Sequence, residues 1–508
     1  QDLFAIVRFR LLDGIRFLFV CFVVKRKDEA IQDFEAGATG KRLHSFRTVG
    51  RKRAARPCVE KDRDSLCKIK RMKRMPKIEE IKRRLSETDS TKIFFVDLNG
   101  RLMSLPINPN IVDRIIDSGM GFDGSAVAGY ASVESSDRIL MPDPESFRVI
   151  PSKSGRLGFF IGHVFNEKGE RAHADPRAIL ERVVALGEQE FGYRFTVGPE
   201  HEYFLLRSNE LHEEMHSDKA GYFHTTPHDH GEAVRNEILA ILGACGIPFE
   251  KAHHEVTPSQ HEINLEAVDP LQAADRTVLF NYVAQQTAAA HGYHATFMPK
   301  PFDGQNRSAF HIHVSMQDLE GRNLFYSESD QGNLSQTARY FIGGILKHAR
   351  GTSLIMASTY NSYKAYVLER EAPILRSWGF RNRSSMVRVP YSNDPQGTRL
   401  ELRSPDPAGN VYLQLAALIA MGLEGVRNRI DAGKPDTGST YRRRVQGRIW
   451  DRRFLPKSLF EALVEAERSR FLRDLLGDRI FENYMALKTR DWEEHRTHVT
   501  PREYAKYL

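Results

Sequence analysis

The sequence predicts an α+β fold in which a small N-terminal domain precedes a large domain with helices on one side of an antiparallel sheet. Two observations support this prediction. The chain has 508 residues, a length that usually folds as two or more domains. Within residues 232–290 a helix, a pair of strands and a second helix follow one another, an order typical of α+β domains.

The N-terminal domain is predicted to begin with a short charged helix at residues 78–85, followed by a β-hairpin. Residues 92–97 are mostly apolar and end in a Leu-Asn-Gly turn signal, so they predict a strand. Residues 102–106 supply the returning strand. The Gly-flanked loop at 121–126 can bring Asp123 close to a ligand, although a plain turn explains the loop as well.

The large domain is predicted to alternate strands and helices. Apolar residues recur at helical spacing over 176–191, 232–246 and 270–290, which predicts three helices that each face a core. Residues 197–206 are apolar and open with a Gly-Pro pair, so we expect a strand entered from a turn. Residues 252–265 supply the strand pair between the second and third helices.

The basic character of the chain lies in its first 74 residues. They hold 20 Lys plus Arg against 9 Asp plus Glu, whereas residues 75–508 have a net charge of −3. The body of the chain therefore gives no electrostatic case for nucleic acid. The apolar run at 17–24 is too short to span a bilayer, so no membrane attachment is predicted. We expect residues 1–74 to be a disordered or non-native leader and Met75 to be the biological start.

Four cysteines fall three in the leader and one, Cys245, in the body. Their spacing matches neither a disulfide framework nor a zinc site. This usage is typical of a reducing compartment, so a cytoplasmic location is predicted.

Two glutamates stand out in the strand at 197–206. Glu200 and Glu202 are two residues apart, so on a strand their side chains point the same way. Two like charges on an apolar segment are costly unless cations or solvent compensate them. A solvent-facing edge strand is the ordinary explanation, and a cation site is the alternative.

Three later segments have a similar composition. His311 and His313 alternate with apolar neighbours, residues 399–403 alternate charge and leucine, and Glu255 and Glu262 bracket a Pro-containing bend. In the first two of these segments, strand periodicity places the polar residues on one face of a sheet and the apolar ones on the other. Five carboxylates and a histidine can hold two divalent ions, and mostly oxygen ligands favour Mg²⁺ or Mn²⁺ over Zn²⁺.

Arginines on the same face would neutralise phosphate, and metal with arginine is the equipment for phosphoryl transfer. The chain lacks a Walker A sequence and kinase signatures, so a nucleotide would need another architecture. The histidines His253, His254 and His261 are equally explained as ordinary polar core or surface residues.

The series of motifs resembles that of the glutamine synthetase family over residues 75–508. The matching segments are 121–125, 198–204, 253–263, 297–301, 306–313, 361–364, 371–373, 382–384, 388–390 and 399–407. The resemblance implies a β-grasp-like domain at 75–175 and a catalytic domain with a curved antiparallel sheet at 176–508. It also implies a dodecamer of two hexameric rings with active sites between neighbours.

The resemblance further implies ATP-dependent ligation of ammonia to the γ-carboxylate of glutamate through γ-glutamyl phosphate. One metal ion is then assigned to Glu202, Glu255 and Glu262, and the other to Glu200, His311 and Glu401. The residues assigned to nucleotide and phosphate are His313, Arg383, Arg388 and Arg399. The residues assigned to chemistry at the acyl centre are Arg383, Asp123 for ammonium deprotonation, and Glu371 on a flap that excludes water. The residues assigned to the acid substrate are Asn306, Arg307, Ala365 and Arg403.

Two of these positions depart from the family pattern. Ala365 replaces an arginine that contacts the glutamate carboxylate, and Arg307 replaces a glycine that lines the amino-acid pocket. Three explanations remain open. The Arg307 guanidinium compensates for the lost arginine, or it selects a different acid, or both side chains face solvent.

Glutamine synthetase activity is therefore the leading prediction. The alternatives are a γ-glutamyl-amine ligase for a polyamine or other amine, a ligase for a different acid, and a non-catalytic structural or sensing homologue. The last is disfavoured because all six predicted metal positions carry ligand-type side chains.

Overall fold

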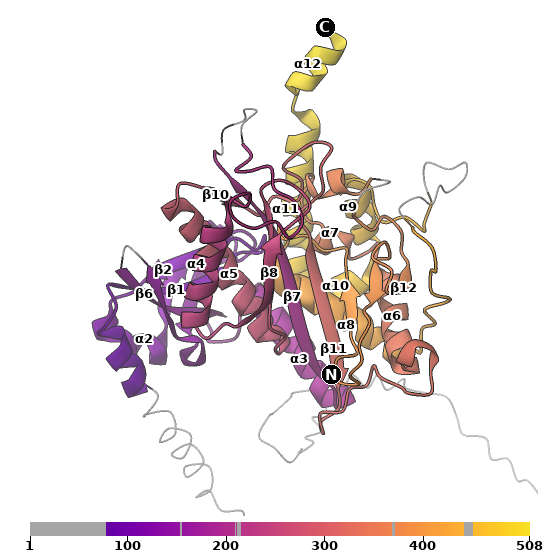
Figure 1. Cartoon of the computed structure of the whole chain (residues 1–508). Coiled ribbons are helices and arrows are strands. Elements are labelled where there is room, and N and C mark those ends of the chain that lie inside the picture. The colour runs from indigo at the N-terminus through magenta and orange to yellow at the C-terminus, as the bar shows by residue number, and fades with distance from the viewer. Residues whose placement is uncertain (1–77, 153–154, 209, 211–214, 368–370, 441–450) are drawn as a thin grey trace, which may run out of the picture. The chain divides into compact units, whose positions relative to one another are not determined.

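The computed structural model describes residues 78–508 apart from the short stretches 153–154, 209, 211–214, 368–370 and 441–450. The predicted leader at 1–74 and the predicted start at Met75 lie outside the described residues. All described residues belong to one compact unit and form two β-sheets (Figure 1).

The smaller sheet has six strands in the order β2-β1-β6-β4-β3, with β5 paired to β6. The strands are β1 (Ser90–Val96), β2 (Leu102–Pro106), β3 (Met120–Asp123), β4 (Asp137–Pro142), β5 (Arg148–Ser152) and β6 (Gly155–Asn166). The β1–β6 pair is parallel and the other pairs are antiparallel. The helical residues 78–85 and helix α2 (Val112–Ser118) contribute to the same buried cluster as β1. The predicted helix and hairpin are thus present.

The larger sheet has eight strands in the order β12-β13-β14-β11-β7-β9-β8, with β10 paired to β7. The strands are β7 (Arg194–Leu206), β8 (Phe249–His254), β9 (Gln260–Leu265), β10 (His294–Thr296), β11 (Phe310–Gln317), β12 (Trp378–Phe380), β13 (Val387–Val389) and β14 (Leu400–Leu402). All pairs are antiparallel except β12–β13, so the predicted antiparallel sheet carries one parallel pair at its edge.

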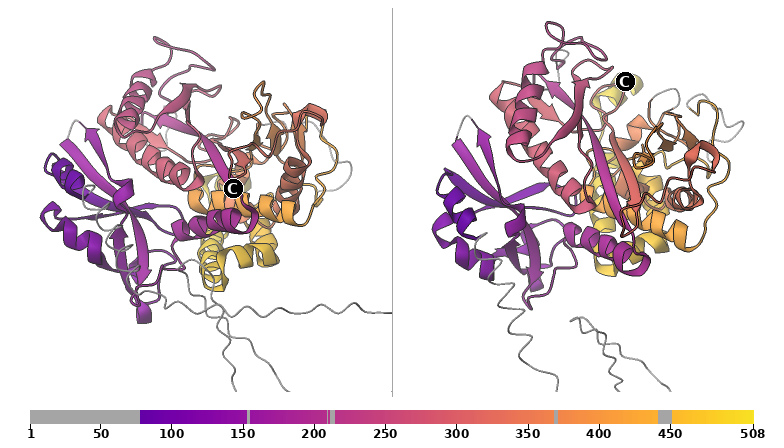
Figure 2. Two further views of the ribbon diagram at one scale, coloured as in Figure 1. Left: turned by 90° about the horizontal axis from the view of Figure 1, so that it is seen from below. Right: turned by 60° about the horizontal axis from the view of Figure 1, so that its bottom comes forward.

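The helices of the large domain are α3 (Pro176–Phe191), α4 (Glu232–Ala244), α5 (Pro270–Ala290), α6 (Gln336–His348), α7 (Ser353–Met356), α8 (Val411–Arg427), α9 (Leu459–Glu467), α10 (Arg470–Leu476), α11 (Asp478–Thr497) and α12 (Pro501–Tyr507). They lie on one side of this sheet (Figure 2), except α12, which is exposed and projects away from the body of the chain (Figure 1). Helix α5 packs on β7 and α4 on β8, while α3 and α6 pack on α8. This arrangement leaves the opposite side of the sheet without a helical layer.

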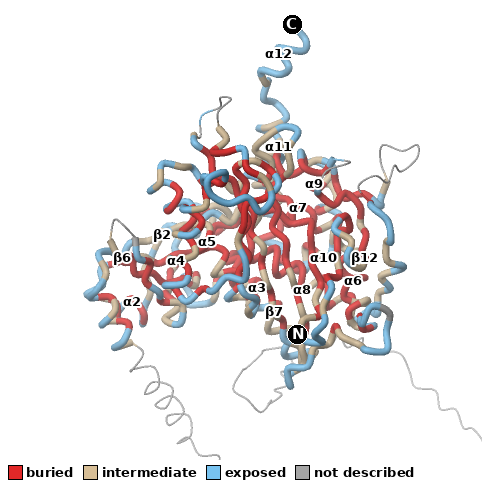
Figure 3. Tube along the Cα trace, in the orientation of Figure 1, coloured by how far each residue is buried: buried red, intermediate tan, exposed pale blue. Residues whose placement is uncertain are grey.

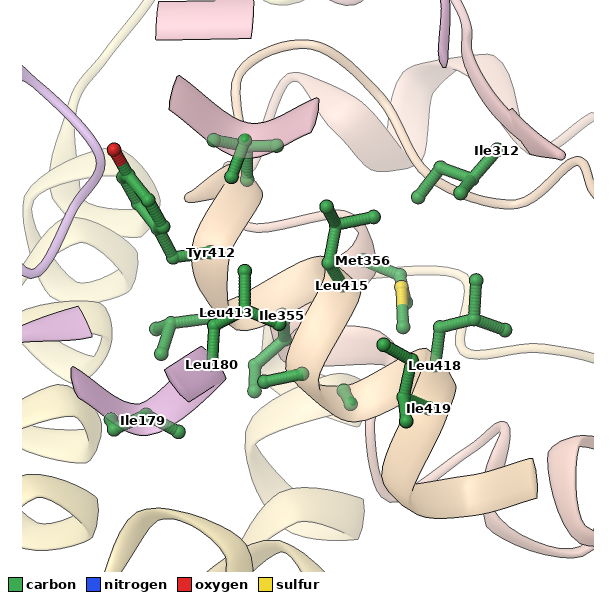
Figure 4. Packing of buried hydrophobic residues seen from close by; sticks show 14 of the residues in the cluster. Ile179, Leu180, Ile312, Ile355, Met356, Tyr412, Leu413, Leu415, Leu418 and Ile419 are labelled. Carbon is green, nitrogen blue, oxygen red and sulfur yellow. The ribbon is translucent and has the colours of Figure 1, made fainter. Parts of the chain in front are cut away.

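The core follows from this layering, because buried residues concentrate where helices meet the larger sheet (Figure 3). Helix α8 is buried on nearly all sides. Its Leu413, Leu415 and Leu418 belong to one cluster with Ile179 of α3 and Ile312 of β11 (Figure 4). Burying one leucine side chain contributes about 1.5–3 kcal/mol, so this cluster fixes β11 firmly against the helices.

Helices α3 and α5 begin where the sequence predicts, because each has an Asp-Pro start. The Asp175 carboxylate accepts a hydrogen bond from the Arg177 amide, and the Asp269 carboxylate accepts two from the first turn of α5. Proline at the first helical position needs no donor there. Gly192 ends α3 with φ 66°, a left-handed conformation that glycine adopts readily.

The predicted turn at the start of the strand at 197–206 is wrong, since β7 begins at Arg194 and runs through Gly198 and Pro199. Pairing with β9 starts only at Glu200, and the next contact on that side is an isolated bridge at Val197. Pro199 lies between them, at a break in the ladder. The missing amide proton therefore costs no hydrogen bond, and the strand continues along β11.

An ionic network around the buried Arg177 joins the smaller sheet to α3 and α5. Arg177 lies within 3.2 Å of Asp143, 2.9 Å of Asp275 and 3.0 Å of Glu181. His163 of β6 lies 3.6 Å from Asp143 and 3.4 Å from Glu181. Burial opposes its charge, but hydrogen bonds to these two carboxylates raise the pKa of His163. Burial also opposes the charges of Asp143 and Glu181, but His163 and the nearby arginines lower the pKa of both carboxyls to about 2.

The network predicts a pH-dependent stability. The pKa of His163 is higher in the folded chain than in the unfolded chain. Its charge therefore stabilises the folded state fully at pH values below the unfolded-state pKa, and this stabilisation is lost as the pH rises through the folded-state pKa. We expect His163→Gln to lower the free energy of unfolding more at about pH 6 than at about pH 9. Urea unfolding at both pH values measures this, with His228→Gln on an exposed loop as the control. An equal loss at both pH values would contradict it.

Candidate active site

The side of the larger sheet without helices carries a cluster of acidic and imidazole side chains. Alternation along β7 places Glu200 and Glu202 on this face. His201 lies on the other face, where its ring centroid is 4.4 Å from that of Phe280 in α5. The two glutamates therefore share one face, as their spacing predicts, and they are not on an edge strand because β7 lies between β11 and β9.

Glu200, His311, His313 and Glu401 form the first group. Strand pairing places His311 opposite Glu200 and His313 opposite Glu401. The Glu200 carboxylate lies 3.1 Å from His311 Nδ1 and 2.9 Å from His313 Nε2. His311 Nδ1 lies 3.8 Å from Glu401 Oε1. Ligand atoms of Glu200, His313 and Glu401 all lie within 4.8 Å of one another, close enough to share one cation.

Glu202, Glu255, Glu262 and His253 form the second group. His253 lies between two carboxylates, 3.6 Å from Glu255 and 3.4 Å from Glu262, and ligand atoms of these three residues also fall within 4.8 Å. The Glu202 carboxylate accepts a 2.9 Å hydrogen bond from Gln260 Nε2. Glu202 Oε1 lies 4.0 Å from His311 Nδ1, so the two groups adjoin.

Burial and like charge give these carboxyls different proton affinities. Burial, with the charges of Glu255 and Glu262, raises the pKa of Glu202 well above its usual range. Burial and the charge of Glu262 raise the pKa of Glu255 to about 7. Against burial, hydrogen bonds from the two imidazoles hold the pKa of Glu200 well below its usual range. The second group thus holds excess negative charge that a cation would compensate.

The donor set fits two divalent cations. Five carboxylates and neighbouring imidazoles converge on one face, and oxygen-rich sets of this kind suit hard divalent ions. His311 Nε2 is buried and has no hydrogen-bond partner within the described part of the chain. On this face, the ligand atoms that lie within 4.8 Å of one another form two sets, one with His313 and one with His253. The family resemblance assigned His311 to the first ion and Glu202 to the second, and both side chains lie next to these sets.

Two residues at this face were missed by the sequence reasoning. The Lys251 ammonium lies 3.9 Å from Glu200 and 3.7 Å from Glu262, so it spans the two groups. Gln260 holds Glu202 and also donates to the Arg307 carbonyl oxygen at 2.8 Å. Strand alternation was the available signal, since Lys251 lies two residues before His253 on β8 and Gln260 two before Glu262 on β9.

The other two histidines of this region lie in the core behind the face. His254 Nε2 lies 3.1 Å from Asp218 Oδ1, and Arg235 donates hydrogen bonds to Asp229 at 2.8 Å and to His261 Nδ1 at 2.9 Å. All five side chains are buried. His254 and His261 are therefore polar core residues, the ordinary explanation left open by the sequence, whereas His253 joins the acidic face.

Arginines surround the first group. Arg388 donates to Glu401 Oε2 at 2.5 Å, and Arg403 donates to the other oxygen of the same carboxylate. The charge of Arg403 lowers the pKa of Glu401 to about 2 despite burial. Arg399 Nε donates to His313 Nδ1 at 3.1 Å. Two arginines predicted to bind phosphate, Arg388 and Arg399, and one predicted to bind the acid substrate, Arg403, thus contact residues of the acidic face.

The Arg307 side chain lies beside Tyr366, the residue that follows Ala365. The Arg307 guanidinium donates to the carbonyl oxygens of Arg403 at 2.5 Å and Ser404 at 3.2 Å. It lies 5.7 Å from the ring centroid of Tyr366, the residue after Ala365. Arg307 is 4% exposed and Ala365 3%, so the explanation that both face solvent is wrong. The strand that carries Glu401 also positions the carbonyls that hold Arg307.

Family models match nearly all of the described chain. Residues 173–507 match the catalytic domain of glutamine synthetase, and residues 88–167 match its β-grasp domain. The chain belongs to the glutamine synthetase family. The predicted family and fold are confirmed, and with them the prediction of a glutamine synthetase-type ligase.

Similar proteins support the family membership. A glutamine synthetase of Thermotoga maritima is 39% identical over 444 residues, covering 85% of this chain and 99% of its own. One of Methanosarcina mazei is 38% identical over 422 residues, covering 82% and 93%. A solved GmaS/ADP complex is 29% identical with a TM-score of 0.75 and covers 84% and 98%. Plasmodium falciparum glutamine synthetase, 23% identical with a TM-score of 0.74 over 85% and 98%, shows the fold alone.

The other residues that the glutamine synthetase resemblance singled out come from four separate segments of the chain. Asp123 ends β3 on the smaller sheet, and its exposed carboxylate accepts hydrogen bonds from the Ser125 amide at 2.8 Å and hydroxyl at 2.7 Å. Glu371 is exposed at the edge of the undescribed stretch 368–370, and Arg383 is exposed after β12. Asn306 is half-buried beside Arg307.

None of the helices in the described part of the chain combines the length and apolar character needed to cross a bilayer.

Proposed function

We propose that the protein ligates ammonia to the γ-carboxylate of glutamate at the expense of ATP, through γ-glutamyl phosphate. The observation that carries this proposal is that two clusters of carboxylates adjoin on one face of the sheet. Arginines donate hydrogen bonds to Glu401 in the first cluster. In this proposal Glu200, His311 and Glu401 hold one divalent cation and Glu202, Glu255 and Glu262 the other. Mg²⁺ or Mn²⁺ bound there would neutralise the phosphate oxygens of ATP.

The chain's own residues take the remaining roles in this proposal. Arg383, Arg388 and Arg399 hold phosphate oxygens, which stabilises charge on the transferring group and the departing ADP. A γ-carboxylate oxygen of glutamate forms the new bond to phosphorus as the bond to ADP breaks. His313 lies beside Arg399 and Glu200 and orients the nucleotide end of the site.

Ammonia then displaces phosphate from the acyl carbon. Hydrogen bonds from Ser125 lower the pKa of Asp123, which keeps its carboxylate ionised and able to attract ammonium. In this proposal the same carboxylate accepts the ammonium proton as ammonia attacks the acyl carbon, although its lowered pKa by itself makes it a weaker base. Glu371 belongs to the flap that excludes water from the acyl phosphate, because hydrolysis competes with amide formation. Since Asp123 lies on the smaller sheet, we propose that it serves the site of a neighbouring subunit in a dodecamer of two hexameric rings.

The acid substrate is proposed to meet Asn306, Arg307, Arg403 and the space at Ala365. The Arg307 guanidinium keeps donors beyond the two it gives to carbonyls, and its Nε is buried with no partner among the described residues. A carboxylate is the natural acceptor for them. Arg307 thereby takes over from the arginine absent at 365.

A second candidate function is the ligation of glutamate to a larger amine, or of a different acid to ammonia. Two departures from the family pattern favour it, namely Arg307 in place of glycine and Ala365 in place of arginine, because both positions border the amino-acid site of the family. A cytoplasmic location and the domain limits 75–175 and 176–508 remain predictions from the sequence.

A phosphate-release assay with the full chain and Mg²⁺-ATP tests the proposal. Glutamate, aspartate and other acids are each paired with ammonia, methylamine and putrescine. We expect the highest turnover with glutamate and ammonia, and none without a divalent cation. Turnover with a different pair and none with glutamate plus ammonia would overturn the leading function in favour of the second candidate.

A further inference from the structure

The loop before β11 carries Asn306 and Arg307, two residues that the proposed function places at the acid substrate. Its base is closed by its own backbone, since the Ser308 amide donates to the Pro299 carbonyl oxygen at 2.8 Å. Gly304, in the turn of the loop, has φ 72°, a left-handed conformation that glycine adopts readily. The contacts that hold this turn therefore decide where the following two residues lie.

His216 contacts the loop at two points. Its imidazole stacks on the Phe302 ring, with the centroids 4.0 Å apart and an angle of 24° between the planes. Its Nε2 lies 3.1 Å from the amide nitrogen of Gln305. Phe302 also makes a T-shaped contact with Phe204 near the end of β7, with centroids 5.5 Å apart. One imidazole thus holds both sides of the turn at 303–304.

The other nitrogen of His216 is anchored in the turn between β8 and β9. His216 Nδ1 lies 3.1 Å from the Ser259 hydroxyl oxygen, which also accepts a hydrogen bond from the Ser217 amide at 2.8 Å. Ser259 is fully buried and has φ 67°, a left-handed conformation that is uncommon for residues other than glycine. The hydrogen bonds of its hydroxyl, and that of its amide to Asp218 at 2.9 Å, offset this strain.

The direction of these hydrogen bonds follows from the charge of the imidazole. Burial lowers the pKa of His216, so the ring is neutral at neutral pH and carries one proton. The Gln305 amide nitrogen can only donate, so Nε2 of the ring accepts and the proton lies on Nδ1. Nδ1 then donates to the Ser259 hydroxyl oxygen. One arrangement of protons therefore satisfies both contacts.

Gln260, the residue after Ser259, reaches the same loop directly. Its Nε2 donates to the Arg307 carbonyl oxygen at 2.8 Å and to the Glu202 carboxylate at 2.9 Å. Two adjacent residues of one turn thus fix the loop on both sides of Asn306, one through the imidazole and the other directly.

We propose that His216 is a positioning residue for the acid substrate, which fixes Asn306 by joining the Ser259 hydroxyl to the Gln305 amide. The role at the substrate rests on the proposed function, whereas the fixing of the loop does not. Loss of one hydrogen bond of this kind shifts an equilibrium by about three- to tenfold, so the loop would populate arrangements in which Asn306 is misplaced. Affinity for the acid should fall, while the reaction of a correctly bound acid should not change.

Two variants separate the two hydrogen bonds of His216. His216→Gln places an amide oxygen near the position of Nε2, so it still accepts from Gln305. His216→Asn places an amide nitrogen near the position of Nδ1, so it donates to Ser259 but is too short to reach Gln305. Both variants lose the stack on Phe302, so a difference between them reports the Gln305 hydrogen bond alone. His173→Asn, the same change at an exposed histidine, is the control.

Hydrogen–deuterium exchange of the full chain measures the loop without any substrate. The Lys300 amide donates to the Asn361 side chain at 2.7 Å and the Ser308 amide to Pro299, so both report opening at the base of the loop. We expect them to exchange about three- to tenfold faster in His216→Asn than in the wild type, and within about twofold of it in His216→Gln. Unchanged exchange in α8 shows that the fold is intact. Equal exchange of the two amides in both variants, whether slow or fast, would overturn the proposal.

Steady-state kinetics test the role at the substrate. His216→Asn should raise the KM for glutamate by about three- to tenfold, with kcat and the KM for ATP within about twofold of the wild type. His216→Gln and His173→Asn should change none of these. A loop that opens faster in His216→Asn without a change in the KM for glutamate would overturn this role. Absent turnover of the wild-type chain, with the expected exchange pattern, would instead count against the proposed function alone.

Discussion

Glu401→Ala is expected to abolish metal-dependent ATP turnover and to lower the stability of the fold. Glu401 is 1% exposed, and its two carboxylate oxygens accept from Arg388 and Arg403. Removing one partner of a buried ion pair costs about 3–5 kcal/mol, because the remaining charges stay buried. Loss of a ligand should lower turnover by at least about 100-fold, the upper range for outer-shell partners of a metal.

Turnover and urea unfolding measured on the same preparation separate these two effects. Glu401→Gln keeps the shape and one hydrogen-bonding oxygen, so it should regain part of the stability and little of the turnover. Glu320→Ala, at a 70% exposed side chain, is the matched control and should change neither quantity. Wild-type turnover in a folded Glu401→Ala variant would contradict the assignment of this face.

Arg307→Met is expected to raise the KM for the acid substrate by about tenfold or more, the loss of one charge-assisted hydrogen bond. Its guanidinium lies beside Tyr366, which follows Ala365, the position where the family pattern has a different arginine. The same change leaves the Arg403 and Ser404 carbonyls without their donor, which should cost about 1–3 kcal/mol of stability. The KM for ATP should stay within about twofold.

A double variant tests whether Arg307 replaces the missing arginine. Arg307→Gly with Ala365→Arg restores the family pattern, so it should recover most of the affinity for the acid that Arg307→Gly alone loses. Arg470→Met, at a 92% exposed side chain, is the control for removing an arginine. A KM unchanged by Arg307→Met, together with lower stability, would show that Arg307 only holds the two carbonyls in place.

Short-range chemistry made much of the fold predictable. The Asp-Pro starts of α3 and α5, and the turn signal after β1, act within a few residues, so their elements appear where expected. The break of the β7–β9 ladder at Pro199 depends instead on where β9 ends, which lies some sixty residues along the chain. No local pattern around Gly198 and Pro199 carries that information.

The acidic face shows the same division. The two-residue period of a strand already predicted that Glu200 and Glu202 share one face of their strand. It predicted the same for His311 and His313 on theirs. Which of them meet depends on the register between β7, β11 and β14, and the register is fixed by packing against the helices. Alternation could place Lys251, His253 and Gln260 on the same face as Glu262, but their contacts with the glutamates depend on how the strands pair.

The sequence by itself determined the family, most of the elements and the five glutamates of the catalytic face with His311 and His313, because these follow from local periodicity and ordered motifs. Only the tertiary structure decided that Arg307 is buried beside Tyr366, that His254 and His261 belong to the core, and that His216 joins Ser259 to Gln305. Side-chain direction in a loop and the space between packed elements depend on contacts between residues far apart in the chain, which no local pattern encodes.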